Sequence, residues 1–322
     1  MNKFHLQEEM SNVTENGPKI ETGALYCENV LGSHHSIFLA TLNFILSITA
    51  SLGNVVILIA LQKRSSLHPP SKLMFRCLAI TDLCVGLITQ PMFAAELIVE
   101  VSELRKICNY IGTVVGISGM VFSGVSLMTL TAISVDRLLA ISLSVRYRQV
   151  VKLRRVGGIL GLFWLLCASV RLMMQLTGLR FFSDLTSAII LLCLIISVYC
   201  YTRIYRRLRI HQTRTENNDI DVGQRNREGI PTWNIEKYQK TVSAAMWIQI
   251  TLVLCFLPFA LLSFEALFPY SAVSHVIVIR YTGSLALLNS SLNPFLYCWK
   301  MTEMRQAVKD IVNKYRCHCK SV

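Results

Sequence analysis

Asp136 and Arg137 are adjacent residues of opposite charge whose side chains could form an ion pair. They follow an uncharged stretch of 29 residues, Ile107–Val135. A helix of about 20 residues already crosses the roughly 30 Å hydrocarbon core of a bilayer, so the pair lies where such a helix meets water. A carboxylate beside a guanidinium at that boundary is either an ordinary anchor of the helix end or part of a switch, and the rest of the sequence has to decide between them.

A second acid, Asp82, lies within the nearly uncharged stretch Leu73–Ala95. A charged side chain at the bilayer centre costs about 2.5–3.5 kcal/mol on insertion scales, so Asp82 is expected to face other helices and to have polar partners. The residues at similar depth that offer oxygens or amides are Asn54, Ser126, Asn289, Ser290 and Asn293. Together with water they could hold a sodium ion, and a hydrogen-bonded cluster without an ion explains them equally.

The chain that positions these residues has the composition of a membrane protein: 322 residues, 53% hydrophobic and 16% charged, with a mean hydropathy of +0.48. Stretches with few or no charges recur seven times, at Ile37–Leu61, Leu73–Ala95, Ile107–Val135, Val156–Leu179, Leu185–Thr202, Thr241–Phe264 and Tyr281–Trp299. In lipid each must satisfy its own backbone hydrogen bonds, so each is predicted to be a helix. The predicted fold is an all-α bundle of seven transmembrane helices.

The net charge of +13 would suggest a nucleic-acid-binding protein if the chain were soluble, but the placement of the charges excludes that class. Most of the 32 Lys and Arg residues fall after the first, third, fifth and seventh stretches. The positive-inside rule assigns these segments to the cytoplasm and the N-terminus to the outside. The sequence therefore predicts a multi-pass plasma-membrane protein that contacts the lipid bilayer and no nucleic acid.

This topology divides the chain into three parts. Residues 1–35 are predicted to be an extracellular segment, and residues 36–299 the seven-helix domain with a cytoplasmic loop at about 209–236. Residues 300–322 are predicted to form a short cytoplasmic amphipathic helix and a tail.

The same topology selects the residues open to covalent modification. Asn12 begins a glycosylation sequon on the outside. Of the 11 cysteines, only Cys27 and Cys108 are extracellular, and they either pair or stay apart, because nothing in the sequence fixes their distance. Cys317 and Cys319 lie in the basic tail and are candidates for palmitoylation.

Arg171 is the most costly charge in the outer half of the predicted bundle, because it lies inside the fourth stretch. It meets either a ligand carboxylate or phosphate, or it extends its side chain to the membrane surface, and we favour the second explanation. Gly112, Gly116 and Gly119 recur about one turn apart in the third stretch. They provide either close helix packing, which we favour, or space for a bulky ligand.

Motifs in all seven stretches resemble those of the rhodopsin-like (class A) G-protein-coupled receptors. In chain order they are Gly53-Asn54, Leu78-Ala79 with Asp82-Leu83, Asp136-Arg137, Trp164, Tyr201, Cys255-Phe256-Leu257-Pro258 and Asn293-Pro294 with Tyr297. Each motif is weak alone, but seven in the correct order are specific. The second outer loop is expected to have only about 8 residues (Leu176–Ser183) and contains no cysteine. In this respect the chain resembles the subgroup of melanocortin, adenosine, cannabinoid and lysophospholipid receptors.

The resemblance implies a receptor that binds an extracellular ligand in the bundle and activates a heterotrimeric G-protein by an outward swing of helix six. It implies no enzymatic activity and no cofactor, apart from an allosteric sodium ion. The implied switch residues are Asp136, Arg137, Tyr201, Phe256, Pro258, Asn293, Pro294 and Tyr297, and the implied sodium site is Asp82, Ser126, Asn289 and Asn293. A ligand pocket is expected around Glu96, Gly119, Arg171, Phe256, Phe259 and Arg280.

The sequence departs from the family pattern at several of these places. Leu138 stands where an aromatic residue usually follows the arginine, and Cys193 replaces the proline of the fifth helix. The acid of helix six that often pairs with the arginine is replaced by Tyr238. We therefore expect Arg137 to be held mainly by Asp136, and basal signalling to be raised.

The ligand class is narrowed only by exclusion. Gly119 occupies the position of the aspartate that binds the ammonium in amine receptors, which disfavours a simple amine. The seventh stretch, Tyr281–Trp299, contains no lysine for a retinal Schiff base, which disfavours light sensing. Two alternatives to a signalling receptor stay open: a receptor-like scavenger or dimer partner, and a transporter, although only Asp82 lies deep in the membrane.

Overall fold

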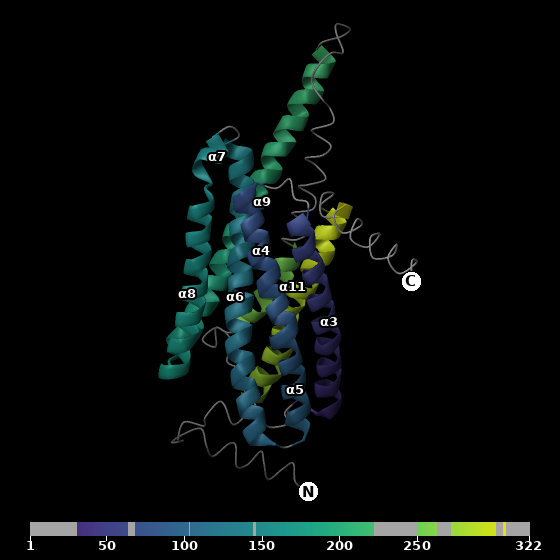
Figure 1. The fold of residues 1–322 in the computed structure, drawn as a ribbon, viewed down its shortest axis with the longest axis vertical. Coiled ribbons are helices and arrows are strands. Elements are labelled where there is room, and N and C mark those ends of the chain that lie inside the picture. Colours follow the sequence, from purple (N-terminus) through teal and green to yellow (C-terminus); the bar gives the residue numbers. More distant parts are fainter. Residues whose placement is uncertain are drawn as a thin grey trace, which may run out of the picture.

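The computed structural model describes residues 31–63, 68–102, 104–143, 146–221, 250–262, 272–300 and 305–306 of the chain. The described part is almost entirely helical, contains no β-strand and forms an elongated bundle (Figure 1). Its labelled helices are α3 (Ser33–Lys63), α4 (Pro69–Cys84), α5 (Gln90–Val101), α6 (Arg105–Leu143), α7 (Tyr147–Val150), α8 (Leu153–Thr177), α9 (Arg180–Asp221) and α11 (Ala272–Lys300). A further helix, Ile250–Leu262, belongs to the predicted sixth span and is called helix six below.

The helices have the length and the surface of membrane spans. Five described segments are long and apolar enough to cross a bilayer, namely Ser33–Gln62, Pro69–Val101, Lys106–Leu143, Leu153–Thr177 and Arg180–Arg207. Helix six and α11 correspond to the last two predicted spans. Large apolar side chains such as Leu52 and Leu165 are 65% and 69% exposed, which suits a surface in contact with lipid and not with water. The predicted all-α bundle is confirmed.

Helix α6 lies at the centre of the arrangement and contacts α4, α5, α8 and α9, whereas α3 packs against α4, α5 and α11. Figure 1 places α7 and the far end of α9 at one end of the bundle, and the start of α3 and the end of α5 at the other. The first end carries the basic connections assigned to the cytoplasm, and the second end is therefore the outer one.

Two predicted connections differ from the structure. Gly178 ends α8 with φ 62°, and its N–H donates to the carbonyl of Met174 at 3.1 Å, which is the glycine cap that lets a helix stop abruptly. Because α9 begins at Arg180, the prediction of an outer loop of about 8 residues is wrong, and Gly178 and Leu179 alone join the two helices.

The cytoplasmic loop predicted at about 209–236 also begins too early, because α9 continues as a helix to Asp221. The first helix-breaking residue in that region is Gly223, so nothing in the local sequence stops the helix where it leaves the membrane. The rest of that loop lies outside the described residues. So does the predicted helix and tail at 300–322, apart from Lys300 and residues 305–306.

A π-helical segment, η1 (Val85–Thr89), separates α4 from α5. The N–H of Gln90 donates to the carbonyl of Val85, five residues back, immediately before Pro91. The proline ring would clash with the carbonyl four residues before it, and a wider turn relieves that clash. One extra residue rotates the following helix by about 100°, which helps to set the face of α5 that points inward. Glu96 and Glu100 lie on that buried face.

Helices α3 and α11 approach closely where the sequence has Gly53 and Pro294. A Cβ atom on Gly53 would lie 2.8 Å from Cβ and Cγ of Pro294, so a glycine is needed there. The neighbouring Asn54 donates to the carbonyls of Ala50 at 2.9 Å and Ser290 at 3.1 Å. This contact joins the first and seventh helices next to the proline that interrupts the hydrogen bonds of α11.

Replacing Gly53 by Ala is expected to destabilise the protein by about 1–3 kcal/mol, because the rigid Pro294 ring cannot move aside as a flexible side chain could. Gly161→Ala is the matched control, since a Cβ at Gly161 meets no atom within 4 Å, and it should be neutral or stabilising by about 0.5–1 kcal/mol. Thermal unfolding of both variants in lipid nanodiscs tests this expectation, and equal midpoints would contradict it.

Candidate functional site

The cytoplasmic end of α6 holds Asp136 in a cradle of three donors. The Asp136 carboxylate accepts hydrogen bonds from the Ser71 hydroxyl at 2.9 Å, the Tyr147 hydroxyl at 2.6 Å and the Arg137 guanidinium at 2.9 Å. Asp136 is only 4% exposed, so its charge depends on these partners. The donors come from α4, α7 and α6, and the cradle therefore ties three segments together.

Tyr147 is placed by α7, a single helical turn between α6 and α8. Burial and the hydrogen bond to Asp136 raise the pKa of Tyr147, so its hydroxyl stays protonated at neutral pH and acts as the donor. The Arg137 side chain is 30% exposed, which leaves its guanidinium within reach of the cytoplasm. Sequence reasoning identified the Asp136 and Arg137 pair but missed Ser71 and Tyr147, which carried no signal beyond being hydroxyl residues near the cytoplasmic helix ends.

The other implied switch residues lie close to this cradle or above it. Tyr201 of α9 is buried and packs with Ile204 against Leu138, the residue that replaces the usual aromatic one. Tyr297 of α11 is buried edge-on against the ring of Phe75, with a centroid distance of 5.5 Å. Its hydroxyl has no hydrogen-bond partner within the described part of the chain. Tyr297 is therefore held by packing in this arrangement.

Asp82 lies deeper in the bundle, fully buried between α4, α6 and α11. It accepts hydrogen bonds from Ser126 at 2.9 Å, Ser290 at 2.8 Å and Asn293 at 2.7 Å. The predicted member Asn289 makes none of these bonds, and its buried side-chain nitrogen has no partner among the described residues. Ser290, which the sequence offered as a candidate partner but which the implied site omitted, takes its place.

The donor set around Asp82 fits a small hard cation. The side-chain oxygens of Asn54 and Asn293 are buried without a hydrogen-bond donor among the described residues. With the carboxylate and the hydroxyls of Ser126 and Ser290, they form an oxygen-rich group of the kind that such cations prefer. The described residues contain no group of three or more His, Cys, Asp or Glu that could hold a metal ion.

A cavity of about 710 Å³ opens above this cluster, toward the outer end of the bundle. Its wall is made by α5, α6, α8, α9, helix six and α11. All six residues of the predicted ligand pocket line it: Glu96, Gly119, Arg171, Phe256, Phe259 and Arg280. The volume falls within the roughly 300–1,000 Å³ of ordinary ligand sites. That these residues bind a ligand stays a prediction.

Arg280 lines this cavity, and two acids balance its positive charge. Its guanidinium lies 2.7 Å from the Glu96 carboxylate and 3.5 Å from the Glu100 carboxylate, and its carbon Cζ lies 5.6 Å from the centre of the Phe93 ring. All three charged side chains are 5% exposed or less. The sequence showed the three charges separately, and the fold joins them into one buried group between α5 and α11.

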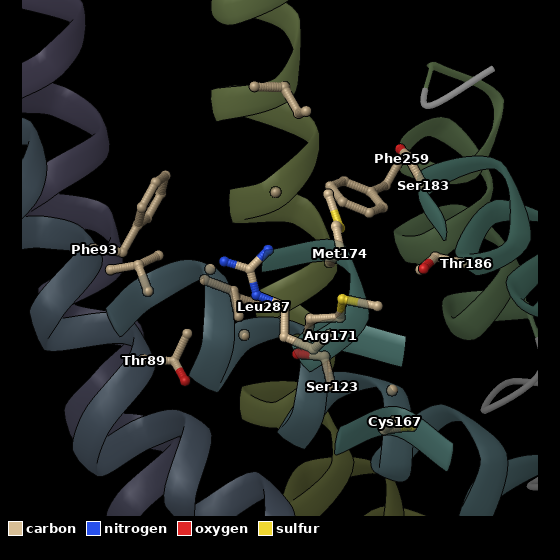
Figure 2. A pocket seen from close by; sticks show the side chains of 18 of the residues that line it. Thr89, Phe93, Ser123, Cys167, Arg171, Met174, Ser183, Thr186, Phe259 and Leu287 are labelled. Atoms are coloured by element: carbon tan, nitrogen blue, oxygen red, sulfur yellow. The ribbon is translucent and has the colours of Figure 1, made fainter. Parts of the chain in front are cut away.

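Arg171 points into the same cavity from α8 (Figure 2). Its terminal nitrogen Nη2 would lie 2.9 Å from a Cβ on Gly116, and the Glu96 carboxylate is equally close to a Cβ on Gly112. These glycines of α6 leave room for charged groups, where the sequence favoured simple helix packing. The favoured prediction of an Arg171 side chain extended to the membrane surface is therefore wrong.

Several predicted residues lie outside the described part of the chain: Asn12, Cys27, Tyr238, Cys317 and Cys319. Their predicted roles stay predictions. Cys108, for which the sequence left pairing with Cys27 open, is fully buried and is disulfide-bonded. The other cysteines of the described residues are free thiols: Cys77, Cys84, Cys167, Cys193, Cys200, Cys255 and Cys298.

The sequence matches the family described as "7 transmembrane receptor (rhodopsin family)" over residues 53–184 and 179–297. The chain belongs to this family. The receptor is similar to melanocortin receptor 5 of Bos taurus, with 25% identity over 324 residues that cover 94% of this chain and 92% of the relative. It is also 25% identical over 320 residues to melanocortin receptor 5 of Homo sapiens, with 94% of this chain and 91% of the relative covered.

Family membership decides the class of function. The receptor is a non-enzymatic, multi-pass protein of the plasma membrane that binds an extracellular ligand and signals through a heterotrimeric G-protein. The resemblance to a subgroup that includes the melanocortin receptors is confirmed, and a transporter is excluded.

Removing Arg280 is expected to destabilise the receptor more than removing either acid, because Glu96 and Glu100 would then be buried without a counter-charge. We expect Arg280→Gln to cost about 3–5 kcal/mol, whereas Glu96→Gln leaves a balanced Arg280 and Glu100 pair and should cost less. The double variant, which combines Arg280→Gln with Glu96→Gln, should be more stable than Arg280→Gln alone. A double-mutant cycle of thermal stabilities measures the coupling, and strict additivity would argue against the buried group.

Proposed function

We propose that this receptor activates its G-protein by releasing Arg137 from the Asp136 cradle when helix six swings outward. The observation that carries the proposal is the set of three hydrogen bonds to Asp136 from Ser71, Tyr147 and Arg137. Two of the three donors come from α4 and α7 and hold the carboxylate in place, so Arg137, whose side chain is 30% exposed, is the partner that we expect to leave. The inactive arrangement is then stabilised by groups of α4, α6 and α7.

The path from the ligand to this cradle runs through helix six. Phe256 lines the outer cavity and is also part of the main hydrophobic core, and Pro258 follows it by two residues. A proline bends the helix and leaves it free to pivot, because one backbone hydrogen bond is missing. A ligand that packs better against Phe256 in one of two arrangements would shift the population toward that arrangement.

At the cytoplasmic end, the moving parts meet at an apolar contact. Tyr201 and Ile204 of α9 pack on Leu138, one residue after Arg137. Val253 and Leu254 of helix six line a small groove together with Tyr201. Movement of helix six would open this groove and increase the exposure of the Arg137 side chain. We expect the G-protein to contact this side chain.

A sodium ion bound beside Asp82 is proposed as the allosteric element between the cavity and the cradle. Asp82, Ser126, Ser290 and Asn293 would hold it, with Asn54 as an additional oxygen donor. The ion would supply a positive charge that balances the buried carboxylate and favours the arrangement in which these helices stay close.

The ligand is proposed to be neither a simple amine nor retinal. A Cβ atom on Gly119 would lie 3.4 Å from the methyl group of Thr89, and the glycine offers no carboxylate for an ammonium. The only lysine of α11 is its last residue, Lys300, far from the cavity wall formed by Arg280 and Leu287. The relatives are named melanocortin receptors. The ligand class proposed for this receptor rests on the residues that line its own cavity.

Tyr147→Phe tests the cradle. A hydrogen bond to a charged group is worth about 1.5–3 kcal/mol, so its loss should shift the equilibrium toward the active arrangement by about tenfold or more. We expect raised ligand-free nucleotide exchange on added G-proteins, and Arg137→Ala should abolish exchange in both backgrounds.

Tyr110→Phe is the matched control, because it removes the hydroxyl of a tyrosine that is 72% exposed at the outer end of α6. Equal basal exchange in Tyr147→Phe and Tyr110→Phe would contradict the cradle. Exchange that persists in Arg137→Ala would contradict the role of the arginine. A complete absence of exchange in the unmodified receptor under every condition would favour the scavenger alternative.

Two neighbouring serines test the sodium site. Ser290 donates to Asp82, whereas the adjacent Ser291 donates to the carbonyl of Leu46 at 3.0 Å. We expect sodium chloride to raise the thermal stability of the receptor relative to choline chloride, and this difference should shrink in Ser290→Ala but persist in Ser291→Ala. Asp82→Asn should remove it. A sodium effect that survives Asp82→Asn would place the ion elsewhere.

A further inference from the structure

We propose that the outer cavity binds an amphiphilic anion, a carboxylate or phosphate head on an apolar body, and that Arg171 is the counter-ion of its head group. This inference rests on the proposed receptor function, since it names the chemical class of the ligand. It is carried by the different surroundings of the two arginines that line one cavity.

The charge of Arg280 is already balanced within the protein, because two buried carboxylates lie beside its guanidinium and the Phe93 ring packs against it. Arg171 has no acid partner within the described part of the chain. Its one hydrogen bond goes to the neutral side-chain oxygen of Gln175 at 3.0 Å, and its nitrogen Nε is buried without a partner. A guanidinium presents five N–H donors, so most of the donors of Arg171 are unused.

Leaving such a group in a half-buried, mostly apolar cavity is costly, and an anionic ligand would offset that cost when it binds. Planar guanidinium groups bind carboxylates and phosphates through two parallel hydrogen bonds, which gives direction as well as attraction. The arrangement therefore favours an anion over a neutral or cationic ligand.

The one acid among the described residues that line the cavity decides on which side of Arg171 the head group lies. Glu96 sits over Gly112, one turn of α6 from the Gly116 that accommodates Arg171, and it would repel an anion on that side. In Figure 2, Arg171 lies between Phe93 on one side and Ser183 and Thr186 on the other. The hydroxyl-bearing side, formed by α9, is free of acids in the cavity wall and is the expected place for the head group.

The remainder of the cavity suits an apolar body. Below and around Arg171 the wall is formed by Met120, Leu127, Met128, Met174, Phe256 and Phe259. Methionine side chains adapt to irregular apolar shapes, and aromatic side chains offer flat contact area. Such a body placed against Phe256 would also touch the helix whose movement is proposed to open the cytoplasmic side.

The test uses the complete receptor in lipid nanodiscs, with thermal stability as the readout. The probes are octadecenoate, which partitions into the bilayer, phenylbutanoate, which is delivered from water, dodecyl phosphate, and octadecenoate methyl ester as an uncharged control. We expect at least one anion to raise the unfolding temperature in a saturable way, and the methyl ester to have no such effect. Activity of octadecenoate alone would indicate a bilayer source of the ligand, and activity of phenylbutanoate an aqueous one.

Arg171→Gln should weaken the apparent affinity for the active anion at least tenfold, and Arg171→Lys, which keeps the charge, should retain part of it. Arg154→Gln, a change of an exposed arginine at the cytoplasmic end of the same helix, is the matched control and should bind normally. The proposal is overturned if no anion stabilises the receptor, if the methyl ester works equally well, or if Arg171→Gln binds as tightly as the unmodified protein.

Failure here is distinguishable from failure of the proposed activation mechanism, because the stability readout needs no G-protein. Normal basal exchange with its expected response to Tyr147→Phe, but no anion effect on stability, would count against the ligand class alone. Anion binding without any effect of Tyr147→Phe on exchange would count against the Asp136 cradle alone.

Discussion

A charge inside a bilayer-spanning bundle is stabilised mainly by groups on other helices, since lipid offers it no hydrogen bonds and little screening. Asp82 draws α4, α6 and α11 together in this way, and Arg280 joins α11 to α5 through two carboxylates. The apolar surfaces of the helices cannot fix their relative rotation as strictly, because lipid and neighbouring helices are equally apolar partners. The few buried charges therefore determine which helix faces meet.

These charged groups lie at three depths in the bundle, and their charges are balanced by different kinds of partner at each depth. Arg280 with its two acids is enclosed at the outer end, Asp82 is surrounded by neutral donors in the middle, and Asp136 shares its donors with an arginine that is partly exposed at the cytoplasmic end. Arg171 departs from this pattern because its cavity gives it only a neutral partner. Among these groups, Arg171 lacks a counter-charge within the described residues, and Arg137 is partly exposed at the cytoplasmic end. Charges placed in this way at both ends suit a bundle that responds at one end to an event at the other.

Small residues decide how closely these parts approach. Gly53 lets α3 touch Pro294 of α11, and Gly112 and Gly116 let charged side chains lie across α6. The glycines of α6 were conspicuous in the sequence, but their spacing alone could not separate helix packing from space in a pocket. That distinction depends on which side chains of α5 and α8 face them, and these come from segments far apart in the chain.

The sequence by itself determined the seven spans, their orientation and the residues that carry charge into the membrane, because hydropathy and the distribution of Lys and Arg are properties of each segment alone. The tertiary structure decided the partners: Ser290 in place of Asn289 beside Asp82, Ser71 and Tyr147 beside Asp136, and the inward direction of Arg171. Each of these choices depends on how a helix is rotated about its axis, and one residue changes that rotation by about 100°. The π-helical turn before Pro91 makes such a change in the helix that carries Glu96, and no feature of the sequence indicated the extra residue in that turn.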